Sequence, residues 1–504
     1  MNSERKPVVC GGVFPLILPL TVLVSYLTAF LIWILRDKPA QIHNRAAVGS
    51  ALINLALVLC LLPGIWREAA FSCNLFTFIP SVDIAFRVDG LGYLFALIAS
   101  FYWLLTAIYS VEYMRNDKFP ARYWFFLFLC MGSVLGIAFA ANLFTLFLFY
   151  EILTICTYPL IVHAQTPQAI KAGRKYLVYS MAGGTALMLS LVITYLLCGH
   201  LDFRPGGILP DSASYSILRL LFITFMVGFG VKSVIFPLHG WLPDAMIAPT
   251  PVSAILHAVA VVKAGVYGIL RIVIDIFGLQ LLQKLHLNEW LLALAGITII
   301  GGSLMALRQT NLKKMLAYST ISQLSYIILG VVMATPSGII GGILQMLYQS
   351  VMKISLFFCA GAIYRQTGVS EIADMGGLGE KIPLTMFAFS IAALGTIGFP
   401  GTAGFISKWY LAMGAMEAGR FFMVGVIISG TLLNAGYYLP LLYKAFFQES
   451  LTRQKGQALS LLMTGPCLLT AGLVLALGLC LWVHKLPLHL AQNIAEGVLY
   501  FKCP

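Results

Sequence analysis

The fold is decided by residues 228–271, which read GFGVKSVIFPLHGWLPDAMIAPTPVSAILHAVAVVKAGVYGILR. Two apolar stretches meet here, the first with Lys232 just before Phe236-Pro237 and the second with His257 and Lys263. A charged side chain at the bilayer centre costs roughly 2.5–3.5 kcal/mol on insertion scales, so ionisable residues in such segments usually have a function. Two lysines beside a proline break therefore predict part of an ion pathway.

The composition of the whole chain places this segment in a membrane. Of the 504 residues, 60% are hydrophobic and only 10% are charged, whereas soluble proteins carry about 25% charged residues. Ten cysteines are scattered without a C-x-x-C pair, so we expect neither a metal site nor a disulfide framework. No nucleotide-binding glycine motif is present, and the net charge of +13 is spread over many short loops. We therefore expect no cofactor and no nucleic-acid partner.

About fourteen apolar segments are long enough to span a bilayer, which takes about 20 residues. They cover residues 12–35, 46–66, 89–110, 123–140, 142–163, 175–198, 215–238, 250–275, 289–307, 314–334, 337–364, 381–411, 421–447 and 458–483. The sequence thus predicts an all-α integral membrane protein with about 14 transmembrane helices and no soluble domain. The last residues, 484–504, are expected to form a short tail on the membrane surface.

Lysines and arginines are more frequent in the loops after odd-numbered segments than on the opposite side, to which we assign Arg87 and Arg271 among others. By the positive-inside rule, the odd-numbered loops are cytoplasmic. This distribution predicts that both termini lie on the outer side of a prokaryotic cytoplasmic membrane.

Two segments combine a proline break with a lysine. The seventh contains Lys232 and Phe236-Pro237, and the twelfth, GTIGFPGTAGFISKW, contains Phe399-Pro400 and Lys408. Interrupted helices in corresponding halves are typical of inverted repeats with binding sites at the breaks. We therefore predict broken helices 7 and 12 and two inverted five-helix repeats, residues 123–275 and 289–447, flanked by residues 1–110 and 458–504.

Glu151 lies in FTLFLFYEILTICTYPLIV, far from any other charge in the sequence. A carboxyl group buried alone becomes neutral, whereas one beside a lysine ionises. Lys232 is its natural partner, and moving the glutamate charge away would let that lysine lose its proton. The alternative is a structural ion pair that joins two helices.

The remaining buried ionisable groups also have two interpretations. Lys263 and Lys353 are candidate proton carriers, although either could instead bind backbone carbonyls of a neighbouring helix. His257 and His239 are possible relays because histidine titrates near neutrality, or they serve packing. Lys408 is a candidate last carrier, or it extends to the membrane interface.

At these residues the chain resembles the antiporter-like subunits shared by respiratory complex I, Mrp-type cation/proton antiporters and membrane-bound hydrogenases. The stretches that carry the resemblance are FPLHGWLPDAMIAPTPVSAILHAVAVVKAGVYGILR, NLKKMLAYSTISQLSYIILG and ADMGGLGEKIPLTMFAFSIAALGTIGFPGTAGFISKWYL. The resemblance implies fourteen helices with helices 7 and 12 broken, and it implies partner subunits, including further antiporter-like ones. Length and the context of Lys408 are most similar to the Mrp D-type subunit.

The resemblance also implies a proton-translocating role for the matching positions, which are Glu151, Lys232, Lys263, Lys353 and Lys408. Two positions depart from the pattern. Met246 stands where many members have histidine, and Gln349 stands where a histidine often precedes the central lysine. Water or Gln349 would then have to bridge the relay.

The sequence therefore predicts a proton-translocating membrane subunit of a redox pump or of an Mrp-type Na⁺/H⁺ antiporter, with no redox chemistry in this chain. Two alternatives remain at this point. An autonomous cation/proton transporter would move ions as a single purified chain. A structural anchor for a redox module would use the lysines only for packing.

Overall fold

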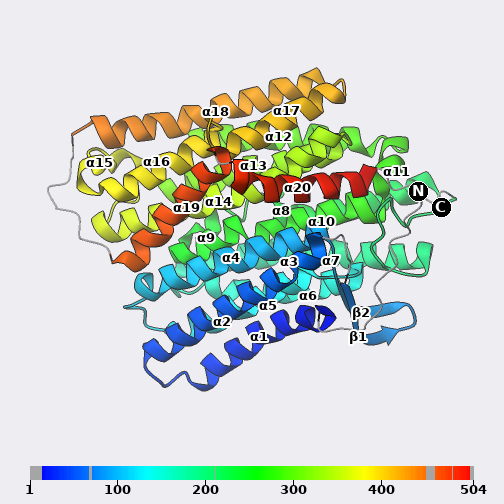
Figure 1. The fold of residues 1–504 in the computed structure, drawn as a ribbon, viewed down its shortest axis with the longest axis horizontal. Coiled ribbons are helices and arrows are strands. Elements are labelled where there is room, and N and C mark those ends of the chain that lie inside the picture. The colour runs from blue at the N-terminus through cyan, green and yellow to red at the C-terminus, as the bar shows by residue number, and fades with distance from the viewer. Residues whose placement is uncertain (1–13, 67–70, 211, 450–459, 480, 500–504) are drawn as a thin grey trace.

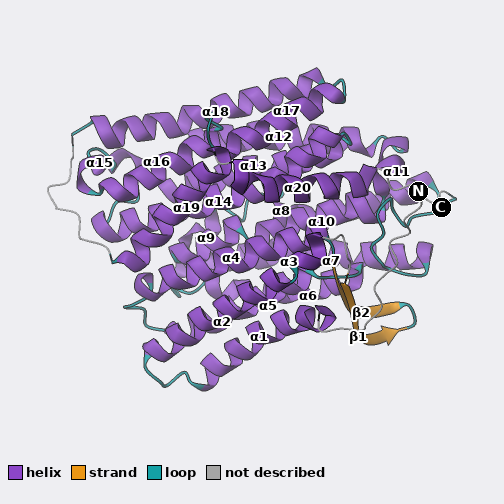
Figure 2. Ribbon diagram, viewed as in Figure 1, coloured by secondary structure: helices purple, strands orange, loops and turns teal. Residues whose placement is uncertain are grey.

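The protein is a bundle of helices that run roughly parallel to one another, with one small pair of strands at one end (Figures 1 and 2). A computed structural model describes residues 14–66, 71–210, 212–449, 460–479 and 481–499. Within these ranges, twelve helices are long and apolar enough to cross a membrane. The polytopic all-α fold is thus confirmed, while the count of fourteen spans stays a prediction.

The first half contains α1 (Phe14–Ile34), α2 (Ala40–Cys60), α3 (Leu62–Trp66), β1 (Phe71–Ile79), β2 (Val82–Val88), α4 (Gly90–Tyr113), α5 (Pro120–Ala138), α6 (Leu143–Ile161), α7 (Pro167–Cys198), α8 (Tyr215–Ser233), η1 (Asp244–Ile247), α9 (Thr250–Ala258), α10 (Val261–Arg271) and η2 (Ile272–Ile276). The strands form an antiparallel hairpin, with Phe71 opposite Val88. The sequence predicts only a loop there, because the hairpin is short and lies between long apolar segments.

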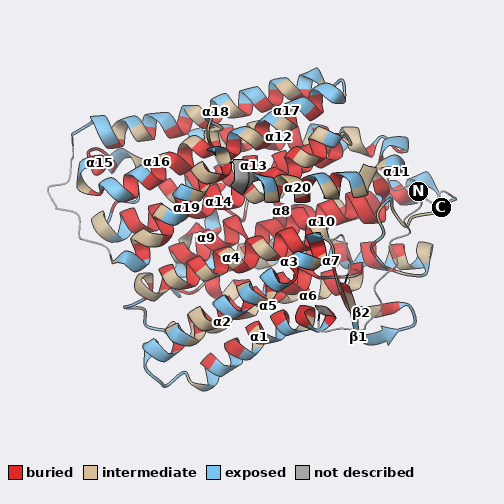
Figure 3. Ribbon diagram, viewed as in Figure 1, coloured by how far each residue is buried: buried red, intermediate tan, exposed pale blue. Residues whose placement is uncertain are grey.

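The second half contains α11 (Gly278–Lys284), α12 (Leu287–Leu307), α13 (Leu312–Val332), α14 (Pro336–Thr367), η3 (Ile372–Asp374), α15 (Leu378–Lys381), α16 (Pro383–Ile397), α17 (Ala403–Glu417), α18 (Phe421–Phe447), α19 (Leu461–Leu479) and α20 (Leu481–Leu499). Helix α14 is the centre of this half and packs against α9, α13, α16, α17 and α19. Buried residues gather on the central helices, whereas the outer helices show exposed faces (Figure 3).

The chain is interrupted at both predicted proline breaks. Helix α8 ends at Ser233, and turns follow as far as η1. Helix α16 ends at Ile397, and Gly398 and Gly401 then adopt φ values of 92° and 87°. Only glycine adopts such angles without steric cost, so these residues make the second break possible. A third interruption, at residues 259–260 between α9 and α10, was not predicted.

The expected surface tail is wrong for its described part. Residues 485–499 belong to α20, which packs against α14 and α4 and buries Leu490, Ala491 and Ala495. The ring of His489 stacks on Trp66 at 4.3 Å. The apolar residues are interspersed with polar ones, which is why the sequence alone suggested a helix lying on the membrane.

Two stretches of the chain repeat the same local structure. An asparagine caps α6 and α13, a threonine caps the 32-residue helices α7 and α14, and a left-handed glycine ends both. An acidic residue beyond each glycine then forms a bridge back to the capping asparagine. The same sequence interval separates every pair, namely Asn142 and Asn311, Thr166 and Thr335, Gly199 and Gly368, and Asp202 and Glu371.

Candidate functional site

Lys232 lies in the last turn of α8 with a side chain that is 1% exposed. Its Nζ donates a hydrogen bond to the carbonyl oxygen of Tyr150 at 2.6 Å and lies 3.3 Å from the centre of that ring. Glu151 follows Tyr150, and its carboxylate lies so close to Gly184 that a Cβ there would come within 2.8 Å of Oε1. The described residues include no ion pair between Glu151 and Lys232, but the two charges still act on each other.

Lys263 is completely buried in α10, and its Nζ donates to the carbonyl oxygen of Met346 in α14 at 2.8 Å. Gly265 explains how α10 comes so close to α8. A Cβ at Gly265 would lie 2.3 Å from the backbone nitrogen of Ser233 and 3.0 Å from the Cβ of Lys232. The absence of a side chain at this glycine therefore brings the segments of Lys232 and Lys263 together.

Lys353 continues a polar face of α14. Gln345, Gln349 and Lys353 are spaced by four residues, which places consecutive members next to each other on a helix. The Lys353 Nζ donates to Ser319 Oγ at 2.6 Å and to Tyr438 OH at 3.4 Å. The lysine is 0% exposed, so these hydroxyl groups of α13 and α18 replace its hydration.

Lys408 in α17 binds the end of the neighbouring half-helix α16. Its Nζ donates to the carbonyl oxygens of Thr396 at 2.9 Å and Ile397 at 2.7 Å. The C-terminal carbonyls of a helix carry partial negative charge and attract cations. The side chain is buried rather than extended to the exterior, and Gly398 leaves it space, since a Cβ there would lie 3.0 Å from Lys408 Cδ.

Several uncharged side chains of this region were missed in the sequence. Gln345 accepts a hydrogen bond from Ser407 at 2.6 Å and donates one to Gln323 at 2.8 Å, so it joins α13, α14 and α17. Tyr437 donates to Ser319 at 2.8 Å, beside Lys353. Single glutamines and hydroxyls are common in apolar helices, and only the four-residue spacing to Lys353 could have singled out Gln345.

The predicted relays contain buried polar atoms that have no partner in the described protein. Both ring nitrogens of His257 and both amide atoms of Gln349 are of this kind. The His257 ring lies 4.7 Å from that of Phe357, one helical turn beyond Lys353. His239 stacks on Phe236 at 3.8 Å in the turn after α8, and its Nδ1 is likewise buried without a partner.

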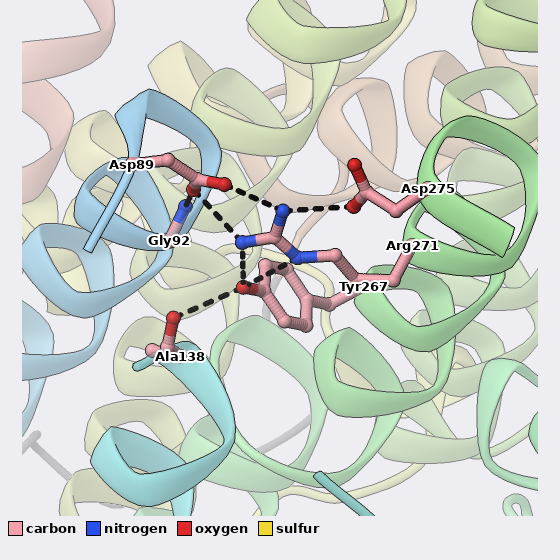
Figure 4. Close-up of polar contacts among 6 residues, drawn as sticks. All are labelled: Asp89, Gly92, Ala138, Tyr267, Arg271 and Asp275. Atoms are coloured by element: carbon pink, nitrogen blue, oxygen red, sulfur yellow. Dashed lines mark hydrogen bonds and ion pairs between the residues drawn. The ribbon is translucent and has the colours of Figure 1, made fainter. Parts of the chain in front are cut away.

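The assignment of Arg271 to a loop was wrong. This residue is the last of α10 and is 3% exposed. It forms ion pairs with Asp89 at 2.6 Å and Asp275 at 2.9 Å, as Figure 4 shows. The sequence signal was available, because Asp275 follows Arg271 at the four-residue spacing of an intrahelical ion pair.

A surface cavity of about 430 Å³ lies where α9 begins, lined by Pro249, Lys313 and Asp117 among others. Asp117 pairs with His163 Nε2 at 3.0 Å. Burial alone would raise the pKa of this carboxyl group, but the hydrogen bonds from His163 and from the Phe119 N–H outweigh burial and lower the pKa below its usual value.

The chemistry available along this axis is proton transfer. Its members are amines, hydroxyls, amides and one carboxyl group, all able to donate or accept protons. Within the described ranges, no three or more His, Cys, Asp or Glu residues are grouped so as to hold a metal ion.

Residues 140–434 match the family model described as NADH:quinone oxidoreductase/Mrp antiporter, transmembrane region, and residues 79–124 match the N-terminal region of complex I chain 5. The chain belongs to this family. It is 34% identical to NADH-quinone oxidoreductase subunit N of Desulforudis audaxviator over 73% of this chain and 74% of that protein. It is 25% identical to a Na(+)/H(+) antiporter subunit of Bacillus subtilis, the one of D type, over 85% and 87%, respectively.

Among solved structures, the fold is similar to a chain of the archaeal membrane-bound sulfane sulfur reductase, with a TM-score of 0.86 and 24% identity over 96% of this chain and 97% of that chain. All five predicted proton carriers fall within the region that matches the NADH:quinone oxidoreductase/Mrp antiporter family. The family and the multi-pass membrane fold predicted from the sequence are thus confirmed.

Proposed function

We propose that this chain moves protons across a membrane as one subunit of a larger complex. The route begins at Glu151 and Lys232, passes Lys263 and Lys353, and ends at Lys408. His257, Gln349 and His239 assist as relays where a lysine does not reach the next carrier directly.

The observation that carries this proposal is the kind of oxygen that binds each lysine. Lys232, Lys263 and Lys408 donate to backbone carbonyls, and Lys353 donates to hydroxyls. A buried ammonium bound only to neutral oxygens is costly, and the cost disappears when the amine loses its proton. Each of these lysines is therefore suited to alternate between its charged and neutral forms.

The atoms without protein partners support a hydrated route. Buried polar groups are almost always satisfied, either by protein or by ordered water. Both amide atoms of Gln349 and both nitrogens of His257 lie next to Lys353 on α14 or against that helix. Water bound to them would extend the file of donors and acceptors between Lys263 and Lys353.

The repeated local structure supports the proposed division into residues 123–275 and 289–447. In the shared register, Gly184 of α7 corresponds to Lys353 of α14. Glu151 fills the space beside Gly184, whereas the second half has a lysine at that position. The two repeats then present a carboxyl group and an amine at equivalent positions, which gives the route a direction.

The relatives suggest two sources of energy. One relative is named as a subunit of an NADH-quinone oxidoreductase and the other as a subunit of a Na(+)/H(+) antiporter. We propose that partner subunits drive proton movement through this chain, by electron transfer or by exchange against sodium. The bacterial relatives are consistent with a cytoplasmic membrane and with both termini on its outer side.

Transport should be measured with the native complex in liposomes that contain a pH-sensitive dye. Two arms energise the vesicles, one with the electron donor of the partner subunits and one with a sodium gradient. Glu151→Gln and Lys232→Met should each abolish proton movement while the complex assembles normally. Glu380→Gln is the matched control, because Glu380 is an exposed residue of α15.

Normal transport by an assembled Glu151→Gln complex would refute the proposed route. If both variants instead prevented assembly, the residues would be structural and the chain would act as an anchor. Proton movement by the single purified chain would show an autonomous transporter.

A further inference from the structure

A second file of polar residues starts at Lys263 and leads away from the proposed route. Lys263, Tyr267, Arg271 and Asp275 follow one another at four-residue spacing along α10 and η2, so each lies beside the next. All four are at most 3% exposed. Asp89, which Arg271 binds, directly follows β2, and its side chain is 32% exposed. The file therefore connects a deeply buried lysine with the surface near the hairpin.

Arg271 occupies this file with every donor in use. Its Nε donates to Tyr267 OH at 3.0 Å, and Nη2 donates to the same oxygen at 2.7 Å and to Asp89 Oδ1 at 2.8 Å. Its Nη1 donates to Asp89 Oδ2 at 2.6 Å and to Asp275 Oδ2 at 2.9 Å. A guanidinium has five N–H donors, so none is left over (Figure 4).

Tyr267 is saturated in the same way. Its oxygen accepts two bonds from Arg271, and its hydroxyl donates to the carbonyl oxygen of Ala138 at 3.0 Å. Gly92 permits this close packing, since a Cβ there would lie 2.4 Å from the same carbonyl. A group passes a proton on only if it accepts one on one side and donates one on the other. Tyr267 has no lone pair free, and Arg271 accepts no proton at any physiological pH.

We propose that Arg271 is a plug that stops protons from leaking between Lys263 and the surface beside the hairpin. The proposal rests on the proposed function, because Lys263 must exchange protons for a leak to begin there. Arg271 keeps the polar file from conducting by filling both lone pairs of Tyr267 and by holding a fixed positive charge in the path. A purely structural role would instead only join α10 to α4 and α5.

The test measures passive proton entry into liposomes that contain the native complex, with no electron donor and no sodium gradient. A potassium gradient with valinomycin sets the membrane potential, and an enclosed dye reports the pH. Arg271→Gln should increase the rate of proton entry several-fold over the unsubstituted complex. Adding Tyr267→Phe or Lys263→Met to Arg271→Gln should return the rate to the original value, because each removes a member of the file.

Removing Arg271 alone leaves two buried carboxylates without a counter-ion, so a second variant guards against failed assembly. Asp89→Asn/Arg271→Gln/Asp275→Asn removes all three charges together, and it should leak as well because Tyr267 is freed. Tight vesicles with either assembled variant would overturn the plug. A leak that persists with Lys263→Met would also overturn it, because the path would then bypass that lysine. Failure of the proposed function shows separately, as energised transport that survives Glu151→Gln.

Discussion

The protein buries two cations in opposite ways. Arg271 is held by two carboxylates and a tyrosine hydroxyl, with all its donors used. Lys353 is buried to the same degree but donates only to hydroxyls, and within the described residues it forms no ion pair. The difference shows how a protein separates a fixed charge from a movable one. A fixed cation is paired, whereas a proton carrier is bound by groups that tolerate its neutral form.

The largest expected effect contrasts the two regions directly. Asp89→Ala should destabilise the protein by about 3–5 kcal/mol, because breaking a buried ion pair leaves the other charge uncompensated. Lys353→Met should leave stability unchanged or higher, since it removes a buried charge that has no counter-ion, but it should abolish transport. Thermal unfolding of the purified complex and proton uptake by liposomes measure the two quantities.

Lys171→Met is the control for this pair, because Lys171 is an exposed lysine of α7 and should alter neither quantity. The contrast between the regions would be refuted if Lys353→Met unfolded the complex as strongly as Asp89→Ala. It would be refuted equally if the Asp89 variant kept its full stability.

The same contrast explains what the sequence could and could not reveal. Lys232, Lys263, Lys353 and Lys408 stand out because each is an isolated charge in an apolar run, and all four are buried. Arg271 was misassigned because it lies at the end of such a run, where arginines are usually exposed. Its partner Asp89 is far away in the sequence, and no local pattern reports an ion pair between distant segments.

The breaks in the helices were predictable to different degrees for a similar reason. Phe236-Pro237 and Phe399-Pro400 carry prolines, which cannot continue a helix, and the chain is interrupted at both. Residues 259–260 contain only valine and alanine, so nothing local marks the break between α9 and α10. The close approach of Gly265 to α8 is a tertiary contact that only the structure reveals.

A second prediction concerns the space around Lys408. Gly398→Ala should reduce transport strongly and destabilise the protein by about 1 kcal/mol, because Gly398 has φ 92° and a Cβ would press on the Lys408 side chain. Gly425→Ala is the matched control, since nothing lies within 4 Å of a Cβ at that position of α18. Equal transport by the two alanine variants would show that the position of Lys408 is unimportant.

A third prediction tests the bridge between the carriers on α14. Gln349→Leu should slow transport by about tenfold, the factor that corresponds to a loss of about 1.4 kcal/mol in the barrier. Leucine has a similar size but cannot bind water, whereas Gln349→His should retain transport because histidine can relay protons. Rates measured at several pH values distinguish the two, and an unaltered rate in the leucine variant would remove Gln349 from the route.

The smallest expected effect lies outside the membrane-spanning segments, at Asp117. Its pKa is lower in the folded protein than the usual value of about 3.9, so its charged form stabilises the fold above that pH. The stabilisation disappears as the pH falls through the lowered pKa, because the carboxyl group is then protonated in both states. Asp117→Asn should therefore lower the melting temperature slightly at pH 7, and the difference should shrink towards zero as the pH falls below about 4. Asp374→Asn, at an exposed residue of η3, is the control. A difference that stayed constant with pH would show that the amide disturbs packing at His163 rather than removing a charge, and Asp117 would then resemble neither the fixed nor the movable class of ion.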